Sequence, residues 1–424
     1  MTGTQAQSNA DSGADSGAES GSAEQRATWT ELFFDLVVVA GVGQLTHLLH
    51  NDPSLADLAL YALLYFAFWT VWTSFTVYGA VEAERASIFT MLVGMLGMAV
   101  IAASVAGIRD SHAPAFIIGY VLLRWFGGRL WRRGTVVIDW PLAQLGVGTL
   151  PWAFSLLARP PVRYWLWALG LALDFVILFT VSGSRLLSGA TTRMERIIKR
   201  RGTDREHAPT IEAVYANAPH LTERLGLYVI IVLGEGFIQT ITAGSGVAWH
   251  PAAIATGLAA FTMLTGLWML SLIDGFAGIP QLRALGSLGA LGSGPTPLRR
   301  ILLLHCVTTA VIAALDAGLG EAVKDAGHTM SPGTRWLLCG ATAAYAVIGL
   351  IAGLMTGSAS PRLSPLRPLI WALPGLVIPL VLGVFGEGAG TGWLVWALTA
   401  TLIWPVLCSR SPLGSRSPLG PRLG

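Results

Sequence analysis

The chain consists mainly of apolar runs of about 20 residues, separated by short polar segments. A bilayer hydrocarbon core about 30 Å thick needs about 20 apolar residues to cross as a helix. Each run therefore predicts one membrane-spanning helix, and the pattern predicts about 12 of them. They lie at 31–50, 57–80, 86–108, 113–131, 136–157, 162–181, 221–244, 250–273, 299–320, 334–356, 366–386 and 391–408.

The polar segments divide the chain into parts. Residues 1–26 are rich in Ser, Gly, Ala and acidic side chains, and 409–424 repeat a Pro/Gly/Arg pattern, so both are predicted to be disordered tails. Six spans fall in 27–181 and six in 221–408, on either side of a basic cytoplasmic loop at 182–220. The Gly/Pro-rich stretch from Gly275 to Pro297 is predicted to be a further loop.

Composition and charge agree with an all-α polytopic membrane bundle. Hydrophobic residues make up 53% of the chain and charged residues 12%, half the level of an ordinary water-soluble protein. Most of the lysines and arginines fall in loops on one side, which predicts cytoplasmic termini. The basic residues therefore reflect topology rather than a nucleic-acid partner, and membrane lipid is the expected surrounding. No cleaved signal peptide is expected.

The two halves show weak internal similarity. Thr30-Glu31 followed by Val37-Val38-Val39 matches Thr222-Glu223 followed by Val229-Ile230-Ile231 at one offset. Six spans per half would make the repeats parallel, as in several secondary transporters. Shared apolar composition is the alternative explanation.

Two strings resemble a known family. The first span reads Glu31-Leu32-Phe33-Phe34-Asp35-Leu36-Val37, and the seventh contains Glu223-Arg224 followed by Val229 to Glu235. Together they resemble the bacterial low-temperature-requirement A family. The resemblance covers the chain from about residue 28 onward and implies a protein of the bacterial cytoplasmic membrane, but it supplies no reaction or substrate. The sequence departs from the family pattern at 76–84 and at Gly236.

Glu235 is the strongest candidate for a functional site. It lies at mid-span between two glycines, and Gln239 follows one turn later on the same face. A charged group at the centre of a bilayer costs at least about 2.5–3.5 kcal/mol, so it needs a partner or a function. Asp174 is also predicted at mid-membrane, either in a shared solute site with Glu235 or in a structural ion pair with Arg124.

Other polar groups could supply an ion or proton route. Glu31 and Asp35 share one face of the first span, where they either stabilise the helix end or bind a cation. His305 and Asp316 share a stripe of the ninth span. Supporting candidates are Gln44, His47, His220, Glu223 and Arg224.

Three functions remain open. The first is a secondary transporter or permease for an unidentified small solute or ion, protons included, with Glu235, Asp174, Asp35, His305, Asp316 and Gln239 on its path. The second is an intramembrane enzyme that uses histidines and acids, although no catalytic residue can be assigned. The third is a scaffold or sensor whose basic loop binds anionic lipid or a cytoplasmic protein. Motifs for ATP or dinucleotides are absent, so no cofactor is expected, and neither is a metal. The sequence does not indicate an oligomeric state.

Overall fold

The computed structural model describes residues 27–410, apart from 83–84, 132–134, 202–209, 274, 278, 280–281, 283–295 and 356–366. The predicted N-terminal tail, all but residues 409–410 of the predicted C-terminal tail, and most of the predicted loop at 275–297 lie outside the described residues. Within the described part, eight helices are long and apolar enough to cross a membrane, and three shorter apolar helices accompany them. The prediction of an all-α membrane bundle is confirmed.

The first half contains five of the apolar helices. They are α1 (Trp29–Thr46), α2 (Leu55–Glu82), α3 (Ile88–Ala103), α4 (Ala113–Gly127) and α6 (Val162–Thr180). Helix α1 begins with a capping box, in which the side chains of Thr28 and Glu31 each accept from the other's backbone N–H. A further helix, α7 (Gly183–Arg201), follows within the segment that was predicted as a loop.

The second half contains six apolar helices. They are α8 (Ala218–Ser245), α9 (Pro251–Trp268), α11 (Thr296–Lys324), α12 (Pro332–Met355), α13 (Arg367–Phe385) and α14 (Thr391–Arg410). A π-helical turn at Met269–Ile273 extends α9.

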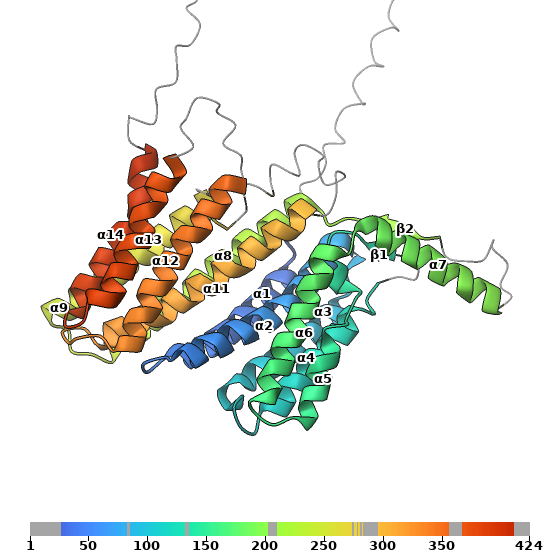
Figure 1. The fold of residues 1–424 in the computed structure, drawn as a ribbon, viewed down its shortest axis with the longest axis horizontal. Coiled ribbons are helices and arrows are strands. Elements are labelled where there is room, and N and C mark those ends of the chain that lie inside the picture. The colour runs from blue at the N-terminus through green and yellow to red at the C-terminus, as the bar shows by residue number, and fades with distance from the viewer. Residues whose placement is uncertain are drawn as a thin grey trace, which may run out of the picture.

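Helices α8 and α11 form the centre of the molecule (Figure 1). Helices α1 and α2 pack beside them, α3 to α6 lie on one side, and α12 to α14 lie on the other. Helices α1, α8 and α11 begin at the same end of the bundle. We call it the inner end, after the predicted cytoplasmic side, and the opposite end the outer end.

The predicted span at 136–157 is wrong as a continuous helix. The segment forms strand β1 (Thr135–Val137), a 3₁₀ turn at Pro141–Ala143, the six-residue helix α5 (Thr149–Phe154) and a second 3₁₀ turn at Ser155–Leu157. Strand β1 pairs in parallel with β2 (Glu212–Val214). Two prolines and two glycines interrupt this apolar run, and both residue types disfavour helix interiors. Hydropathy alone cannot detect such an interruption. The fourth helix also stops early, at Gly127 instead of residue 131.

A buried ion pair holds this broken segment in place. Arg124 Nη2 lies 3.1 Å from Asp174 Oδ2, and both side chains are almost fully buried. Arg124 Nη1 also donates to the carbonyl of Leu142 at 3.0 Å. A Cβ on Gly148 would lie 2.4 Å from Asp174 Oδ1, so glycine lets the broken segment approach the carboxylate. The expected pairing of Arg124 with Asp174 is present, and it joins α4, α6 and the segment between them.

Arg299 ties α11 to the same region. Its guanidinium donates to four backbone carbonyls, those of Ile138, Asp139, Leu178 and Val181. The last two belong to the C-terminal end of α6, where carbonyls lack helical partners. The inner ends of the two halves are therefore joined by one side chain.

Asp174→Asn should destabilise the protein because it leaves the charge of Arg124 buried without a counter-charge. Losing one partner of a buried pair costs about 3–5 kcal/mol. Denaturant unfolding in detergent micelles should show this loss for Asp174→Asn and little change for the exposed control Asp110→Asn. Replacing both Arg124 and Asp174 by Leu should recover most of the loss. An Asp174→Asn protein as stable as the wild type would contradict this role.

Asp139 should make stability depend on pH. It lies outside the apolar helices, where burial raises its pKa to about 6 from 3.8, against the opposing effects of the Ala216 N–H and Arg299. Because the raised pKa favours the neutral form, the stabilisation is complete below about pH 4 and is lost as pH rises through 6. The loss relative to Asp139→Asn should approach 3 kcal/mol, at about 1.4 kcal/mol per pKa unit. Thermal unfolding between pH 4 and 7 would measure it, and parallel curves for the two proteins would exclude it.

Candidate functional site

The inner end of the α1–α8 interface contains a buried arginine between two carboxylates. Arg224 donates to both oxygens of Asp35, at 2.9 Å from Nε and 2.6 Å from Nη2. Neither side chain is exposed. Such bidentate pairing is the strongest geometry available to arginine and a carboxylate. It fixes α1 and α8 in register at the inner end.

Glu31 completes this inner cluster one turn away. Its Oε1 lies 2.9 Å from Arg224 Nη1 and 3.0 Å from His220 Nε2. The contact with Arg224 lacks hydrogen-bond alignment, so it is electrostatic. Its Oε2 accepts from the backbone and hydroxyl of Thr28. Two carboxylates thus face one arginine, and the cluster is neutral when His220 is protonated and carries one negative charge when it is not.

Aromatic rings cover the inner cluster on its membrane side. Trp72 Nε1 donates to Asp35 Oδ1 at 2.8 Å. The Trp72 ring lies against Tyr228, with centroids 4.2 Å apart, and stacks on His305 at 5.8 Å. His305 Nε2 is 3.1 Å from the Leu225 carbonyl. His305 therefore packs above the cluster in a fully enclosed position instead of facing water.

A second pair of carboxylates lies further along, near the middle of α8 and α11. Glu235 and Asp316 are close enough for their charges to interact. Gln239 Nε2 donates to Glu235 Oε1 at 3.2 Å and to Thr46 Oγ1 at 2.9 Å. Asp316 is fully buried, and neither of its carboxylate oxygens has a hydrogen-bond partner. Among the described residues, no Lys, Arg or His forms an ion pair with either acid.

Two glycines make room for these carboxylates. A Cβ on Gly43 of α1 would lie 2.7 Å from Glu235 Oε1, and a Cβ on Gly236 of α8 would lie 2.3 Å from Asp316 Oδ1. Each acid therefore lies against the bare backbone of a neighbouring helix. We call Glu235, Asp316, Gln239 and Thr46 the middle site.

A third polar group lies at the outer end. His50 Nδ1 is 3.7 Å from Glu321 Oε1, which also contacts Lys324 Nζ at 2.6 Å. The side chain of Lys324 is 48% exposed. Polar side chains thus follow the α1–α8–α11 interface from the inner cluster, through the middle site, to an exposed outer end.

The structure brings some predicted residues together and separates others. Asp35, His305, Glu31, His220 and Arg224 meet at the inner end. Glu235, Gln239 and Asp316 meet in the middle. Asp174 and Arg124 lie elsewhere, between α4 and α6, so they are not part of the middle site. Gln44, His47 and Glu223 are exposed; Glu223 accepts from the Ala27 N–H and His47 packs against His50.

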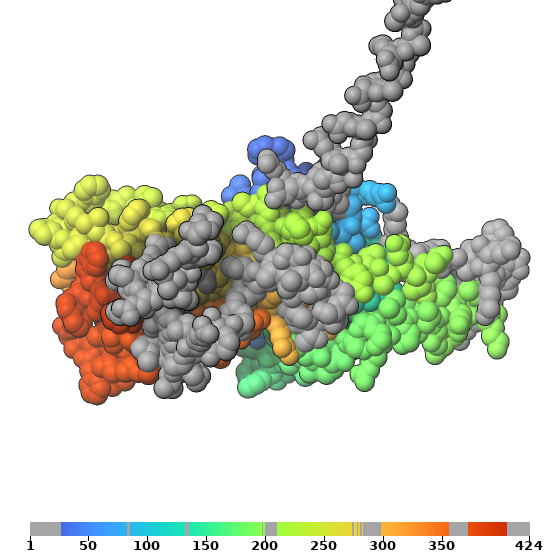
Figure 2. All heavy atoms as spheres, turned by 90° about the horizontal axis from the view of Figure 1, so that it is seen from above, coloured from blue at the N-terminus to red at the C-terminus, as the bar shows by residue number. Residues whose placement is uncertain are grey.

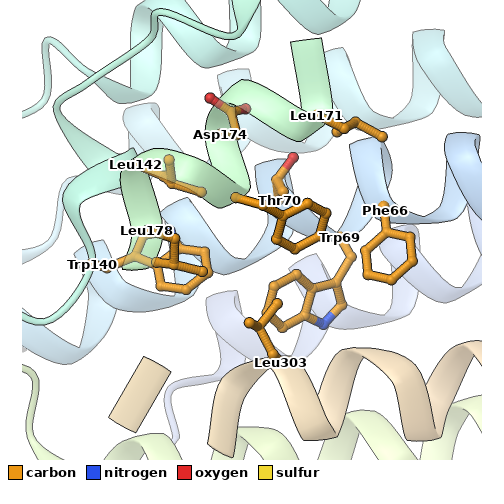
Figure 3. Close-up of a pocket in the computed structure, with 10 residues that line it drawn as sticks. Phe66, Trp69, Thr70, Trp140, Leu142, Leu171, Asp174, Leu178 and Leu303 are labelled. Atoms are coloured by element: carbon orange, nitrogen blue, oxygen red, sulfur yellow. The ribbon is translucent and has the colours of Figure 1, made fainter. Parts of the chain in front are cut away.

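Asp174 borders a separate small pocket (Figure 3). Aromatic and aliphatic side chains of α2, α6, α11 and the broken segment line it, among them Trp69, Trp140 and Leu303. Its free space of about 10 Å³ is no more than a single water requires. This pocket does not accommodate a larger solute in the present conformation.

Trp72, Tyr228 and Thr46 were missed as site residues. The Trp72 indole packs against Tyr228 and also donates to the carboxylate of Asp35 on α1. A single helix pattern cannot show which acid on another helix lies opposite. Within the described part of the chain, no group of three or more His, Cys, Asp or Glu residues could hold a metal ion.

Comparison with known proteins assigns the family. Comparisons with curated proteins and with solved structures find no match. The family described as bacterial low temperature requirement A protein (LtrA) matches residues 26–407. This match includes α1, α8 and α11, which carry both the inner cluster and the middle site. Because it covers nearly the whole described chain, the protein belongs to the bacterial low temperature requirement A family.

Proposed function

We propose that the protein is a secondary transporter whose middle site binds a proton or a small cation. The observation that carries this proposal is Asp316, a fully buried acid with two unpartnered oxygens beside a second acid. An ionised carboxylate in a low-dielectric interior is strongly unfavourable without a counter-charge. Since no described basic side chain supplies one, a proton or bound cation is the remaining way to satisfy the pair.

The polar interface supports a route to this site. The outer group is partly exposed, and Gln239 interacts with both His50 of that group and Glu235 of the middle site. The inner cluster separates the site from the inner end by a bidentate ion pair under stacked aromatic rings. We propose that the cluster is the inner gate, closed in this conformation.

We further propose twelve membrane crossings, with residues 141–157 as the fifth. Irregular backbone at membrane depth is tolerated where protein buries it. Helices α4 and α6, which the Arg124–Asp174 pair joins, pack against this segment. With twelve crossings both termini lie on the cytoplasmic side of the bacterial membrane. Helices α1 and α8 then begin the two halves in the same orientation, as parallel repeats require.

The inner cluster should tolerate loss of Glu31 better than loss of Arg224. Arg224→Gln removes the counter-charge of the fully buried Asp35, and should cost about 3–5 kcal/mol or prevent folding. Glu31→Gln keeps the Asp35–Arg224 pair and an oxygen for Thr28, so its cost should stay near 1 kcal/mol, typical of a weakened cap. Denaturant unfolding of both variants in detergent would compare them. Equal losses would contradict a cluster organised around Asp35 and Arg224.

Transport should depend on both middle acids. Protein reconstituted in liposomes that enclose a pH-sensitive dye would receive an inward-driving membrane potential and external pools of amino acids, sugars, organic acids and amines. For wild type, at least one pool should acidify the lumen. Glu235→Gln and Asp316→Asn should lose at least about tenfold in rate, which is about 1.4 kcal/mol in the barrier. The exposed Glu387→Gln is the matched control.

Carbodiimide labelling tests the middle site without knowledge of the solute. A buried carboxyl that exchanges protons reacts with dicyclohexylcarbodiimide in its protonated form, so labelling of Glu235 or Asp316 should fall as pH rises. Mass spectrometry would locate the label. Unchanged transport in both variants, or no labelling of either acid between about pH 5 and 9, would reject the site.

A further inference from the structure

Helix α7 begins directly after a membrane span. Helix α6 ends at Thr180, and Val181 and Ser182 are the residues between it and α7. Two residues span at most about 7 Å, so the first turn of α7 lies at the inner membrane surface. The helix itself is about 28 Å long, at 1.5 Å for each of its 19 residues.

The two faces of α7 differ in chemistry. Basic side chains are exposed along it, namely Arg185, Arg193, Arg196 and Lys199. Apolar side chains recur three or four residues apart on the other face, namely Leu187, Ala190, Met194 and Ile198. This spacing defines an amphipathic helix. A basic polar face opposite an apolar face is typical of helices that lie in a membrane interface.

Most of α7 extends away from the bundle. Its start rests on the segment around β1, where Gly183 lies against Ile138. Beyond this contact the helix projects sideways from α6 (Figure 1), and the view along the perpendicular direction shows the same extension (Figure 2). The described bundle therefore leaves its apolar face without a protein partner along most of its length.

We propose that α7 is a binding site for anionic phospholipid, lying flat in the inner leaflet with its apolar face among the acyl chains and its basic face at the headgroups. The position after α6 places the helix at the required depth. The charge supplies the specificity, because among the α7 side chains that the structure describes four exposed cations are accompanied by one exposed acid, Glu195. Because α7 is attached to the end of a membrane span, lipid always lies next to its apolar face, and this favours lipid over a protein as the partner.

Spin labelling of the full chain tests this placement. With Cys306, Cys339 and Cys408 replaced by Ala, a nitroxide is attached at Met194→Cys on the apolar face or at Thr192→Cys on the polar face. In phosphatidylglycerol bilayers the label at 194 should collide readily with oxygen and poorly with a water-soluble nickel chelate. The label at 192 should show the opposite.

The effect of lipid composition on the burial of the label at 194 distinguishes contact with lipid from contact with protein. In phosphatidylcholine, or after Arg185, Arg193, Arg196 and Lys199 are changed to Gln, burial of the label at 194 should weaken, by about fivefold in partitioning for each charge. Equal nickel access at 192 and 194 in phosphatidylglycerol would overturn the proposal. So would a label at 194 that is equally protected in anionic lipid, zwitterionic lipid and detergent, since that result indicates a protein contact.

Discussion

The arrangement of the bundle depends on how it buries the charge of Arg224. An arginine with no exposure in a membrane bundle is tolerable only if carboxylates surround it with good geometry. Asp35 accepts two hydrogen bonds from Arg224, Glu31 provides a second negative charge, and Trp72 donates a further hydrogen bond to Asp35. These contacts fix α1 against α8. They also fix the position of α2, because Trp72 of α2 donates to the same acid. The parallel alignment of α1, α8 and α11 that places all other polar groups starts from this point.

Within the described part of the chain, the middle site lacks the opposite charge that the acids of the inner cluster have. There, two acids meet with no basic partner among the described residues, and one has no hydrogen bond at all. Gly43 and Gly236 leave space for these carboxylates, because a Cβ at either position would collide with a carboxylate oxygen. Elsewhere in the described bundle, the buried charges of Arg224 and Asp174 each face an opposite charge. The lack of a counter-charge for Asp316 among the described residues distinguishes the middle site from those pairs, and the proposed function rests on it.

Sequence patterns predicted most of the architecture and only part of the site. Long apolar runs located the helices because hydrophobic length is a local property. They failed at 136–157, where the residues are equally apolar but prolines and glycines disrupt the helix. The Arg124–Asp174 pair was predictable because opposite charges were expected at similar depth. The neighbours of Glu235 were not, since Gly43, Thr46 and Asp316 come from distant segments, and helix packing alone decides which of them face each other.

The two ends of the polar interface are closed to different degrees, and this bears on how a site between them would exchange with water. At the inner end, separating α1 from α8 must break a bidentate ion pair and expose stacked rings of Trp72, Tyr228 and His305. At the outer end, the contact between His50 and Glu321 is longer, at 3.7 Å, and Lys324 is half exposed. The outer polar group is therefore more exposed than the inner cluster. In the proposed function, a proton that binds Asp316 from that side reaches the inner end only after the pair between Asp35 and Arg224 opens, so inward release depends on the salt bridge that organises the fold.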